Sequence, residues 1–372
     1  MKIGIVTWCC YHNFGTFLQA YALQRYLQQN GFDVKILNDY KYSVKQPYSV
    51  KIKSSIKELI KRVFFPKLYK PLKLDKISDA LYDSFKVKYL SVDYFVDCLL
   101  DVNQRYDVFV CGSDQIWNPG GFKRKGNDFY FASFASKPKI AYAPSIGLKS
   151  IPSECKEYFS QLISDFAFLS VREHSASLAL GDICKRPIDV VVDPTLLVDR
   201  IVWQQLVGNE FNSEKYIFLY LLTNNEVYIS AAYDYAQRHG LKVKVVKACG
   251  VDLGIEEAKP AGPLEFLHLL AGASYVMTDS FHASIFSLVY RKAFVVFKRF
   301  KETDDANQNS RVENLLNKLG LIDRLLDEKH LQTIDRLEEV DFNKVDKMLS
   351  REIQHSREYL MKALKVVQNE RS

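Results

Sequence analysis

The sequence predicts an α/β protein with two Rossmann-like domains that face each other across a cleft. Short apolar segments repeatedly give way to a small polar cluster and then to a helical pattern, which is typical of a doubly wound parallel sheet. The chain has 372 residues, more than one ordinary core supports. After Asp193-Pro194, near Trp203, the pattern of apolar and polar residues changes and a second series of strands and helices begins. The predicted units are an N-terminal domain at 1–200, a C-terminal domain at 201–340 and a terminal helix at 341–372.

The first domain begins with a β-α-β unit. Residues 2–7 form a short apolar strand, 17–27 have helical spacing and 32–37 form the next strand. Asn30-Gly31 should end the helix, because glycine readily adopts the left-handed conformation found there. The turn at 9–16 is not a GxGxxG sequence and is therefore no dinucleotide fingerprint. Further strands are predicted at 106–111, 139–143, 166–171 and 190–192.

The second domain repeats this alternation. Its predicted strands are 216–221, 242–246, 275–278 and 294–297, and its predicted helices are 227–238, 264–270 and 311–320. A polar loop is expected at 302–310. The last helix should run from Asp341 to Val367 and, as in other two-domain architectures of this kind, cross back to the first domain.

The composition indicates a globular protein, with 48% hydrophobic and 26% charged residues. No apolar run reaches the ~18 residues that a membrane span needs. The chain enters a strand at once, without a signal peptide, so we expect a cytoplasmic location. The seven cysteines are scattered and include no CxxC, which argues against a disulfide framework and a structural zinc site. Cys111 and Cys249, at strand ends, are expected to be buried small apolar residues.

A basic stretch at 41–76 holds eleven Lys or Arg and only two acids. Within it, apolar residues from Ile56 to Phe64 recur at helical spacing with Lys57, Lys61 and Arg62 between them. The ordinary interpretation is a solvated helix over the first domain. A basic amphipathic helix on an anionic membrane surface is the sharper alternative. Nucleic acid is not expected as a partner, because nothing else in the chain resembles a nucleic-acid-binding module.

Polar residues follow the predicted strands at the ends that should face the cleft. Ser280 and His282 lie on a strand-to-helix turn, where a helix N-terminus offers free N–H groups to an anion. The other candidates are the cations Arg172 and Arg311, the hydroxyls of Ser113 and Ser145, and the amides of Asn13, Gln115 and Asn309. No His, Asp or Glu cluster has metal-ligand spacing. Each candidate also has a structural alternative, such as helix capping for His282 or an ion pair with Glu173 for Arg172.

The chain resembles the polysaccharide pyruvyl transferase family through six blocks, which contain all of these residues except Ser145 and Asn309. The blocks occur in the family's order between residue 1 and about 320. They are Asn13-Phe14-Gly15 through Gln24, Gly112-Ser113-Asp114-Gln115-Ile116-Trp117-Asn118, Val171-Arg172-Glu173, Val192-Asp193-Pro194-Thr195-Leu196-Leu197, Thr278-Asp279-Ser280-Phe281-His282 and Ser310-Arg311-Val312-Glu313-Asn314-Leu315-Leu316. Ala283 departs from the glycine of many members and adds a methyl group beside the site.

The resemblance implies a glycosyltransferase-B-like fold and a pyruvyl transferase that uses phosphoenolpyruvate as co-substrate, with no other cofactor and no metal. The product would be a cyclic pyruvate ketal on a hexose of a cell-surface polysaccharide or its lipid-linked precursor, with release of phosphate. By this resemblance His282 is the proton donor and acts with Arg172 in catalysis. The implied donor-binding residues are Arg172, Ser280, His282, Asn309, Ser310 and Arg311.

The sugar acceptor would lie against the first domain, and the donor against the second. The candidate acceptor-binding residues are His12, Asn13, Gly15, Ser113, Asp114, Gln115 and Ser145. If the acceptor is linked to a lipid diphosphate, the stretch 41–76 could hold the protein at the inner face of the membrane. A nucleotide-sugar-dependent glycosyltransferase of the same gross fold is the alternative enzyme, although the region 250–300 lacks a convincing Glu-centred ribose motif. A non-enzymatic glycan-binding protein is a further alternative, and it would not need His282.

Overall fold

The computed structural model describes residues 1–39, 76–94, 99–121, 127–208, 211, 213–248, 250–301, 304 and 307–370. Apart from Lys76, the basic stretch 41–76 lies outside these residues, so its predicted amphipathic helix stays a prediction. Cys249 lies outside them as well, whereas Cys111 is fully buried, as expected.

The first half of the chain forms a five-stranded parallel sheet with strand order β3-β2-β1-β4-β5. The strands are β1 (Lys2–Val6), β2 (Asp33–Leu37), β3 (Val92–Asp93), β4 (Val108–Cys111) and β5 (Lys139–Ala141). Ile3 of the central strand β1 pairs with Val34 on one side and Val108 on the other. Four of the five residues of β1 are buried, which explains the nearly continuous apolar run in its sequence.

The second half forms another five-stranded parallel sheet with order β12-β11-β10-β8-β9. Its strands are β8 (Tyr216–Tyr220), β9 (Lys242–Val245), β10 (Tyr275–Thr278), β11 (Ala293–Phe297) and β12 (Leu325–Leu326). The strand β10, which precedes the turn with His282, lies between β8 and β11. Its carboxyl end therefore opens at the middle of the sheet edge, where ligands of such sheets bind.

The strand predicted at 166–171 is much shorter than expected, and the one predicted at 190–192 begins one residue earlier. Only β6 (Ser170–Val171) and β7 (Asp189–Val190) form, and they pair with each other in a small separate ladder. Phe166 belongs instead to a turn that closes the preceding helix, because its N–H donates to the carbonyl of Ile163. Phe168 still bridges to Ile140 of β5, so this ladder extends the edge of the first sheet.

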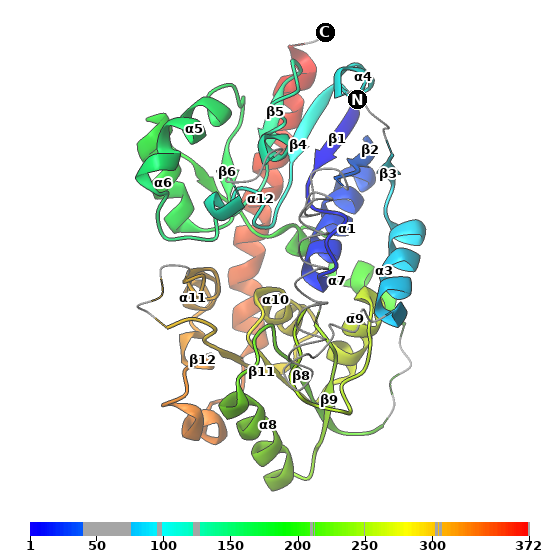
Figure 1. Cartoon of the computed structure of the whole chain (residues 1–372), viewed down its shortest axis with the longest axis vertical. Helices are drawn as coiled ribbons and strands as arrows, with labels where there is room; N and C mark the ends of the chain where they lie inside the picture. The colour runs from blue at the N-terminus through cyan, green and yellow to red at the C-terminus, as the bar shows by residue number, and fades with distance from the viewer. Residues whose placement is uncertain are drawn as a thin grey trace, which may run out of the picture.

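Helices cover both sheets (Figure 1). In the first half they are α1 (Phe14–Gln29), α3 (Lys76–Tyr89), α4 (Leu99–Arg105), α5 (Ser153–Ile163), α6 (His174–Cys184) and α7 (Arg200–Val207). In the second half they are α8 (Glu226–Arg238), α9 (Pro263–Gly272), α10 (Phe281–Val289), α11 (Ser310–Lys318) and α12 (Phe342–Asn369). Short 3-10 turns lie at η1 (Pro119–Gly121), η2 (Asn127–Phe131), η3 (Pro194–Leu196), η4 (Ile322–Arg324) and η5 (Leu331–Arg336). The predicted domain boundary at 200/201 falls at the start of α7.

Helix α1 begins three residues earlier than its apolar pattern indicates. The side chain of Asn13 caps it by accepting a hydrogen bond from the N–H of Thr16 at 3.2 Å. This cap brings Gly15 into the first turn of the helix. At the other end Gly31 has φ +84, the left-handed conformation that the Asn30-Gly31 sequence predicts.

The terminal helix α12 crosses back to the first domain, as predicted, and runs past both sheets in Figure 1. Near its start, Asp346 pairs with Arg291 of the second half at 2.6 Å. Near its end, the hydroxyl of Tyr359 donates to the carbonyl of Ala141 in β5 at 3.1 Å. The helix therefore joins the two halves through contacts at both of its ends.

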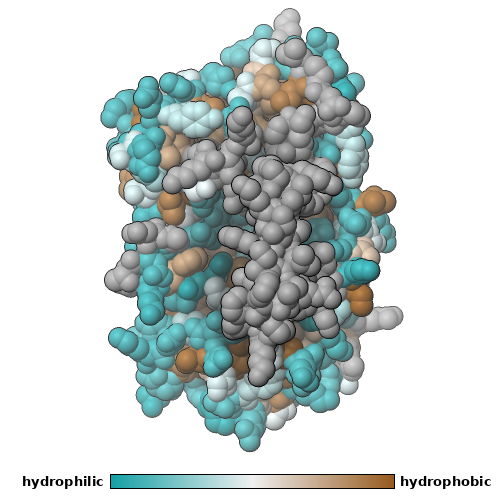
Figure 2. Space-filling model, in the orientation of Figure 1, coloured by the Kyte–Doolittle hydropathy of each residue, from teal (hydrophilic) through white to brown (hydrophobic). Residues whose placement is uncertain are grey.

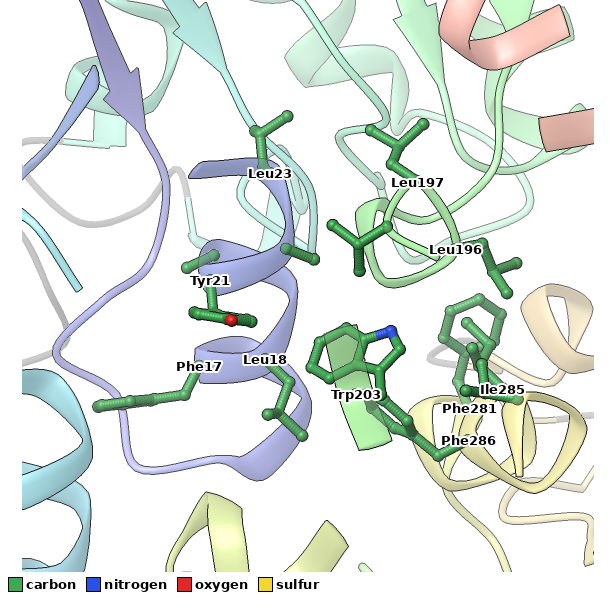
Figure 3. Packing of buried hydrophobic residues seen from close by; sticks show 14 of the residues in the cluster. Phe17, Leu18, Tyr21, Leu23, Leu196, Leu197, Trp203, Phe281, Ile285 and Phe286 are labelled. Carbon is green, nitrogen blue, oxygen red and sulfur yellow. The ribbon is translucent and has the colours of Figure 1, made fainter. Parts of the chain in front are cut away.

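One apolar core continues between the two halves (Figure 3). Trp203 of α7 is its centre, and its indole lies 5.7 Å from the ring of Tyr21 in α1 and 4.9 Å from that of Phe286 in α10. The indole N–H donates to the carbonyl of Thr195 at 3.1 Å. The helices that bear Gly15 and His282 are thus held together by close packing, which resists small displacements.

Hydrophilic residues dominate the coloured part of the face in Figure 2, and apolar residues form small separate patches there. Among the described helices, none has the length and apolar character that crossing a membrane would require.

Candidate active site

The turn between β10 and α10 forms one wall of the site. Ser280 caps α10, because its Oγ accepts a hydrogen bond from the N–H of Ala283 at 3.4 Å. The N–H of Ser280 in turn donates to Oγ1 of Thr278 at 3.0 Å. Ser280, and not His282, therefore caps this helix, while its position also places it on the wall of the cavity.

His282 is buried in the first turn of α10 and faces Gly15 of α1. A Cβ atom built on Gly15 would lie only 2.0 Å from Nδ1 and 2.2 Å from Cγ of the imidazole. Glycine is therefore required at position 15 for the ring to occupy this place. On its other side, Nε2 of His282 lies 3.5 Å from Oδ2 of Asp193 and has no hydrogen-bond partner.

Asp193 is a fully buried carboxylate that joins several of these groups. Its Oδ1 accepts hydrogen bonds from the N–H and the hydroxyl of Thr195, at 3.0 and 2.7 Å. Its Oδ2 pairs with Nη1 of Arg172 at 2.5 Å. Burial opposes ionisation of Asp193, but the neighbouring His282 and Arg172 outweigh it and hold the pKa of Asp193 well below its ordinary value. Asp193 thus remains a negative charge beside the imidazole.

Arg172 is buried between Asp193 and the ring of Phe281. Its guanidinium lies 4.5 Å from the centre of that ring, a cation–π contact. Nη1 also donates to Oγ of Ser113 at 3.5 Å, and Nη2 lies 3.9 Å from Oδ1 of Asp114. Nε and Nη2 have no hydrogen-bond partner. The ion pair with Glu173 that was the structural alternative for Arg172 is not formed; Arg172 pairs with Asp193 instead.

Arg311 also lies near this ring, 5.8 Å from the centre of Phe281. Nη2 donates to Oε1 of Gln308 at 3.0 Å, and the side-chain amide of Gln115 lies 2.9 Å from the same nitrogen. Nε has no partner. Burial and the nearby charge of Arg172 lower the pKa of Arg311 to about 10. Arg311 is therefore a buried cation that still carries its charge at neutral pH, and not a solvated one.

Asp114 is contributed by the turn after β4. It has φ +68, a left-handed conformation that is uncommon for residues other than glycine. Its Oδ2 accepts a hydrogen bond from the hydroxyl of Thr16 at 2.6 Å, and its Oδ1 accepts one from the N–H of Gln115 at 2.9 Å. These contacts offset the backbone cost and fix the carboxylate at the edge of the cavity.

Arg299, which follows β11, is a second arginine on the wall. Its Nε has no hydrogen-bond partner and lies 3.9 Å from Oδ2 of Asp279. That carboxylate is occupied by other groups, because Thr223 donates to it from its N–H and its hydroxyl, at 3.1 and 2.6 Å. Burial also raises the pKa of Asp279. Asp279 therefore makes no hydrogen bond to the Nε of Arg299.

These groups surround a cavity of about 450 Å³. Both halves of the chain line it, with Trp8, Tyr11, Asn13, Thr16, Asp114 and Gln115 from the first and Asp279, Ser280, Phe281, His282, Arg299, Phe300, Gln308, Asn309 and Arg311 among those from the second. Unpartnered nitrogens of Arg299, Arg311 and His282 belong to side chains of this lining, whereas the predicted site residue Arg172 contacts the lining residue Phe281 and is not itself part of the lining. Within the described residues, the lining of this cavity contains no group of three side chains spaced to hold a metal ion.

Four predicted site residues have other neighbours. The ring of His12 stacks on Tyr82 at 4.6 Å, and its Nδ1 lies 2.9 Å from Oδ1 of Asp79, away from the cavity lining. The hydroxyl of Ser145 donates to Glu173 at 2.7 Å. Ser310 is buried at the start of α11 and is not on the cavity wall. Asn309 lines the cavity while its amide bonds to the backbone of Phe300.

Sequence reasoning did not assign Asp193, Arg299, Trp8 or Tyr11 to the site. Asp193 follows a predicted strand in the same way as the assigned residues, but its neighbour Pro194 was taken as a mark of the domain boundary. Arg299 comes two residues after β11, so the same strand-end rule would have found it. Trp8 and Tyr11 carry no charge and therefore gave no signal.

The fold and the site together define a two-domain α/β protein with a glycosyltransferase-B-like arrangement and a cationic cavity between its sheets. Two structures named UDP-N-acetylglucosamine 2-epimerase share this fold. One has a TM-score of 0.53 and 10% identity, with 98% of this chain and 95% of that chain covered. The other, from Rickettsia bellii, has a TM-score of 0.52 and 9% identity, with 99% and 97% covered.

The sequence matches the polysaccharide pyruvyl transferase family over residues 13–299. The chain therefore belongs to the polysaccharide pyruvyl transferase family, a family of transferases, as its sequence blocks predicted. No curated protein matched the sequence.

Proposed function

We propose that the protein transfers a pyruvyl group from phosphoenolpyruvate to two hydroxyls of one hexose, which forms a cyclic ketal and releases phosphate. The observation that supports this most is the set of buried, unpartnered nitrogens of Arg299, Arg311 and His282 in the lining of one cavity, with those of Arg172 beside the lining residue Phe281. A buried donor without an acceptor costs about 1–3 kcal/mol. A small ligand rich in anionic oxygens would satisfy several of these donors at once.

Phosphoenolpyruvate fits this requirement because it carries both a phosphate and a carboxylate. Arg311 and Arg299 line the cavity, whereas Arg172 is not part of its lining and is already paired with Asp193 at 2.5 Å. We therefore assign the anionic groups of the donor mainly to Arg311 and Arg299, with Arg172 completing the site. The N-terminus of α10 adds a partial positive charge where the departing phosphate accumulates negative charge.

His282 would supply the proton that the reaction needs. Its imidazolium protonates the methylene carbon of the enol, the adjacent carbon accepts a sugar hydroxyl oxygen, and that hydroxyl loses its proton. The first hydroxyl's proton returns to the imidazole of His282. The second hydroxyl oxygen then displaces the phosphate, which leaves with the electron pair of the C–O bond and takes up the second hydroxyl's proton. The ionised carboxylate of Asp193, 3.5 Å away, stabilises a protonated imidazole. A positioned proton donor of this kind contributes ~10²–10⁴-fold in rate.

The acceptor sugar would lie on the wall contributed by the first half of the chain. Asn13, Asp114 and Gln115 offer polar groups there, and Trp8 and Tyr11 offer aromatic faces. A carboxylate such as Asp114 can accept hydrogen bonds from sugar hydroxyls. We extend the proposal to a hexose of a cell-surface polysaccharide or its lipid-linked precursor. Contact of residues 41–76 with an anionic membrane surface, which would suit a lipid-linked acceptor, stays a prediction.

The test is incubation of the full chain with phosphoenolpyruvate and a panel of hexosides, followed by phosphate assay and mass spectrometry. We expect phosphate release together with an acceptor mass that shows the pyruvate ketal, and loss of both in His282→Ala. A parallel incubation with nucleotide sugars tests for glycosyl transfer. Transfer of a hexose from a nucleotide sugar, with no ketal from phosphoenolpyruvate on any acceptor, would refute the proposal. Full ketal formation by His282→Ala would remove the proton-donor role.

A further inference from the structure

Two adjacent cysteines and an aspartate lie together beyond the carboxyl ends of β1 and β2, outside the cavity lining. Sγ of Cys9 lies 3.9 Å from Sγ of Cys10 and 3.2 Å from Oδ1 of Asp39. The potential ligand atoms of all three lie within 4.8 Å of one another. In the described part of the chain, this is the one group of three such side chains with this spacing.

We propose that Cys9, Cys10 and Asp39 bind a zinc ion. Two thiolates on a tetrahedral zinc at ~2.3 Å lie roughly 3.8 Å apart, close to the 3.9 Å between these sulfur atoms. The donor set of two sulfurs and a carboxylate suits zinc better than magnesium or calcium, which prefer oxygen. Oδ1 of Asn38, 3.2 Å from Sγ of Cys10, or a water molecule can supply the fourth ligand.

The surroundings of the group hold it in place and balance its charge. The hydroxyl of Tyr130 donates to the second oxygen of Asp39 at 2.9 Å, and the N–H of Cys9 donates to the first at 3.3 Å. Such outer contacts orient metal ligands. Nζ of Lys86 lies 3.1 Å from Sγ of Cys10. Two thiolates and a carboxylate would carry three negative charges, which a divalent ion and this ammonium would neutralise.

A hydrogen-bonded cluster of thiols is the competing explanation. Adjacent side chains of an extended strand point to opposite faces, yet both sulfurs here lie on the same side, next to a buried carboxylate. The bend after β1 places both sulfurs on this side, so folding does not require a hydrogen bond between them. A search for CxxC overlooks this arrangement, because the cysteines are adjacent and Asp39 follows 29 residues after Cys10, at the end of β2.

Binding there would be structural. The site links the turn after β1 to the turn after β2. The first of these turns continues into Tyr11 and Asn13, which line the cavity. A metal ion would therefore stiffen one wall of the cavity from outside. This metal-site proposal does not depend on the proposed reaction.

The experiment uses the purified full chain without an affinity tag, stripped with a chelator and titrated with Co²⁺ as a spectroscopic probe and then with Zn²⁺. We expect saturation at roughly one equivalent, tetrahedral ligand-field bands, thiolate-to-cobalt charge transfer, and displacement of the cobalt by zinc. Cys9→Ser/Cys10→Ser should abolish the charge-transfer band, and Asp39→Asn should weaken binding about 10-fold or more. Cys184→Ser is the matched control, because Cys184 is a free cysteine in α6 and not in the turn after β1. The titration of this variant should match that of the wild type.

Absence of thiolate-to-cobalt charge transfer in the wild-type chain would overturn the proposal, whatever the variants do. An unchanged band in Cys9→Ser/Cys10→Ser would overturn it as well. Circular dichroism without metal identifies a variant that fails to fold. In that case the single variant Cys10→Ser, at the less buried of the two cysteines, replaces the double variant, and an unchanged band in it contradicts the assignment to these cysteines.

Discussion

Gly15→Ala tests whether the place of the His282 ring controls the reaction. The added Cβ would lie 2.0 Å from Nδ1 of the imidazole, whereas contacts under 3.0 Å are essentially not observed for real Cβ atoms. The ring must therefore move by about 1 Å or more. A misplacement of this size costs on the order of 10²-fold in rate, which corresponds to about 2.7 kcal/mol of transition-state stabilisation. We expect kcat for ketal formation to fall by roughly this factor.

Helix stability should not account for the loss. Alanine is favoured over glycine in a helix by about 1 kcal/mol, and Gly15 lies in α1 without a positive φ. The assay is phosphate release from phosphoenolpyruvate with a saturating acceptor, measured for Gly15→Ala, His282→Ala and the double variant. If position 15 acts through the imidazole, the double variant should be no slower than His282→Ala alone.

The matched control for this substitution is Gly181→Ala in α6. The nearest atom to its new Cβ would be a carbonyl oxygen at 3.4 Å, an ordinary contact, so activity should stay near that of the wild type. A Gly15→Ala enzyme with undiminished kcat would refute the argument. So would losses from Gly15→Ala and His282→Ala that simply add in the double variant.

Three further substitutions test the charges of the site. Asp193→Asn removes half of a buried ion pair with Arg172 and should destabilise the fold by about 3–5 kcal/mol at neutral pH. Folding lowers the pKa of Asp193 from 3.8, so the stabilisation that its charge gives is present above that pH and is lost as the pH falls below it. Thermal melts should therefore show a shallower loss of stability in acid for the variant than for the wild type. An acid decline as steep as in the wild type would contradict the assigned charge. Arg299→Gln removes a charged hydrogen-bond donor and should lower kcat/KM for phosphoenolpyruvate roughly 10- to 150-fold. The control Arg238→Gln, at an exposed ion pair, should leave kcat/KM unchanged. Equal values for the two variants would exclude a role of Arg299 in binding phosphoenolpyruvate. Phe281→Leu keeps an apolar side chain but loses two cation–π contacts, and steady-state kinetics should show a several-fold higher KM for phosphoenolpyruvate; an unchanged KM would show that the ring does not position the arginines.

The fold and much of the site follow from one rule, because polar residues at the carboxyl ends of parallel strands meet at one edge of a sheet. This rule brought Asp114, Ser280 and His282 to the cavity. It does not specify which way a side chain turns once the strand has ended. His12 is close to the cavity along the chain, yet its ring stacks on Tyr82 of α3, a contact between residues 70 positions apart that no local pattern encodes.

The short strands β6 and β7 show the same limit for secondary structure. Their apolar sequences resemble those of the longer strands, but the turn that closes α5 takes up Phe166 and leaves few residues for pairing. Strand lengths at the edge of a sheet thus depend on the neighbouring helix connections. The central strands β1 and β10, which have partners on both sides, match their predicted positions.

The packing of Trp203 has a consequence for how this protein can be recombined with its relatives. Its indole joins α1 to α10, and its N–H donates to Thr195, which itself donates to the carboxylate of Asp193. The two halves are therefore not interchangeable modules. A chimera joined near residue 200 would combine an α1 and an α10 that were selected against different tryptophan neighbours, and these helices would pack poorly next to Asp193. Exchange of acceptor specificity between members of the family should instead be attempted within the first half alone, with α1, the turn at Asp193 and α7 kept from the same parent.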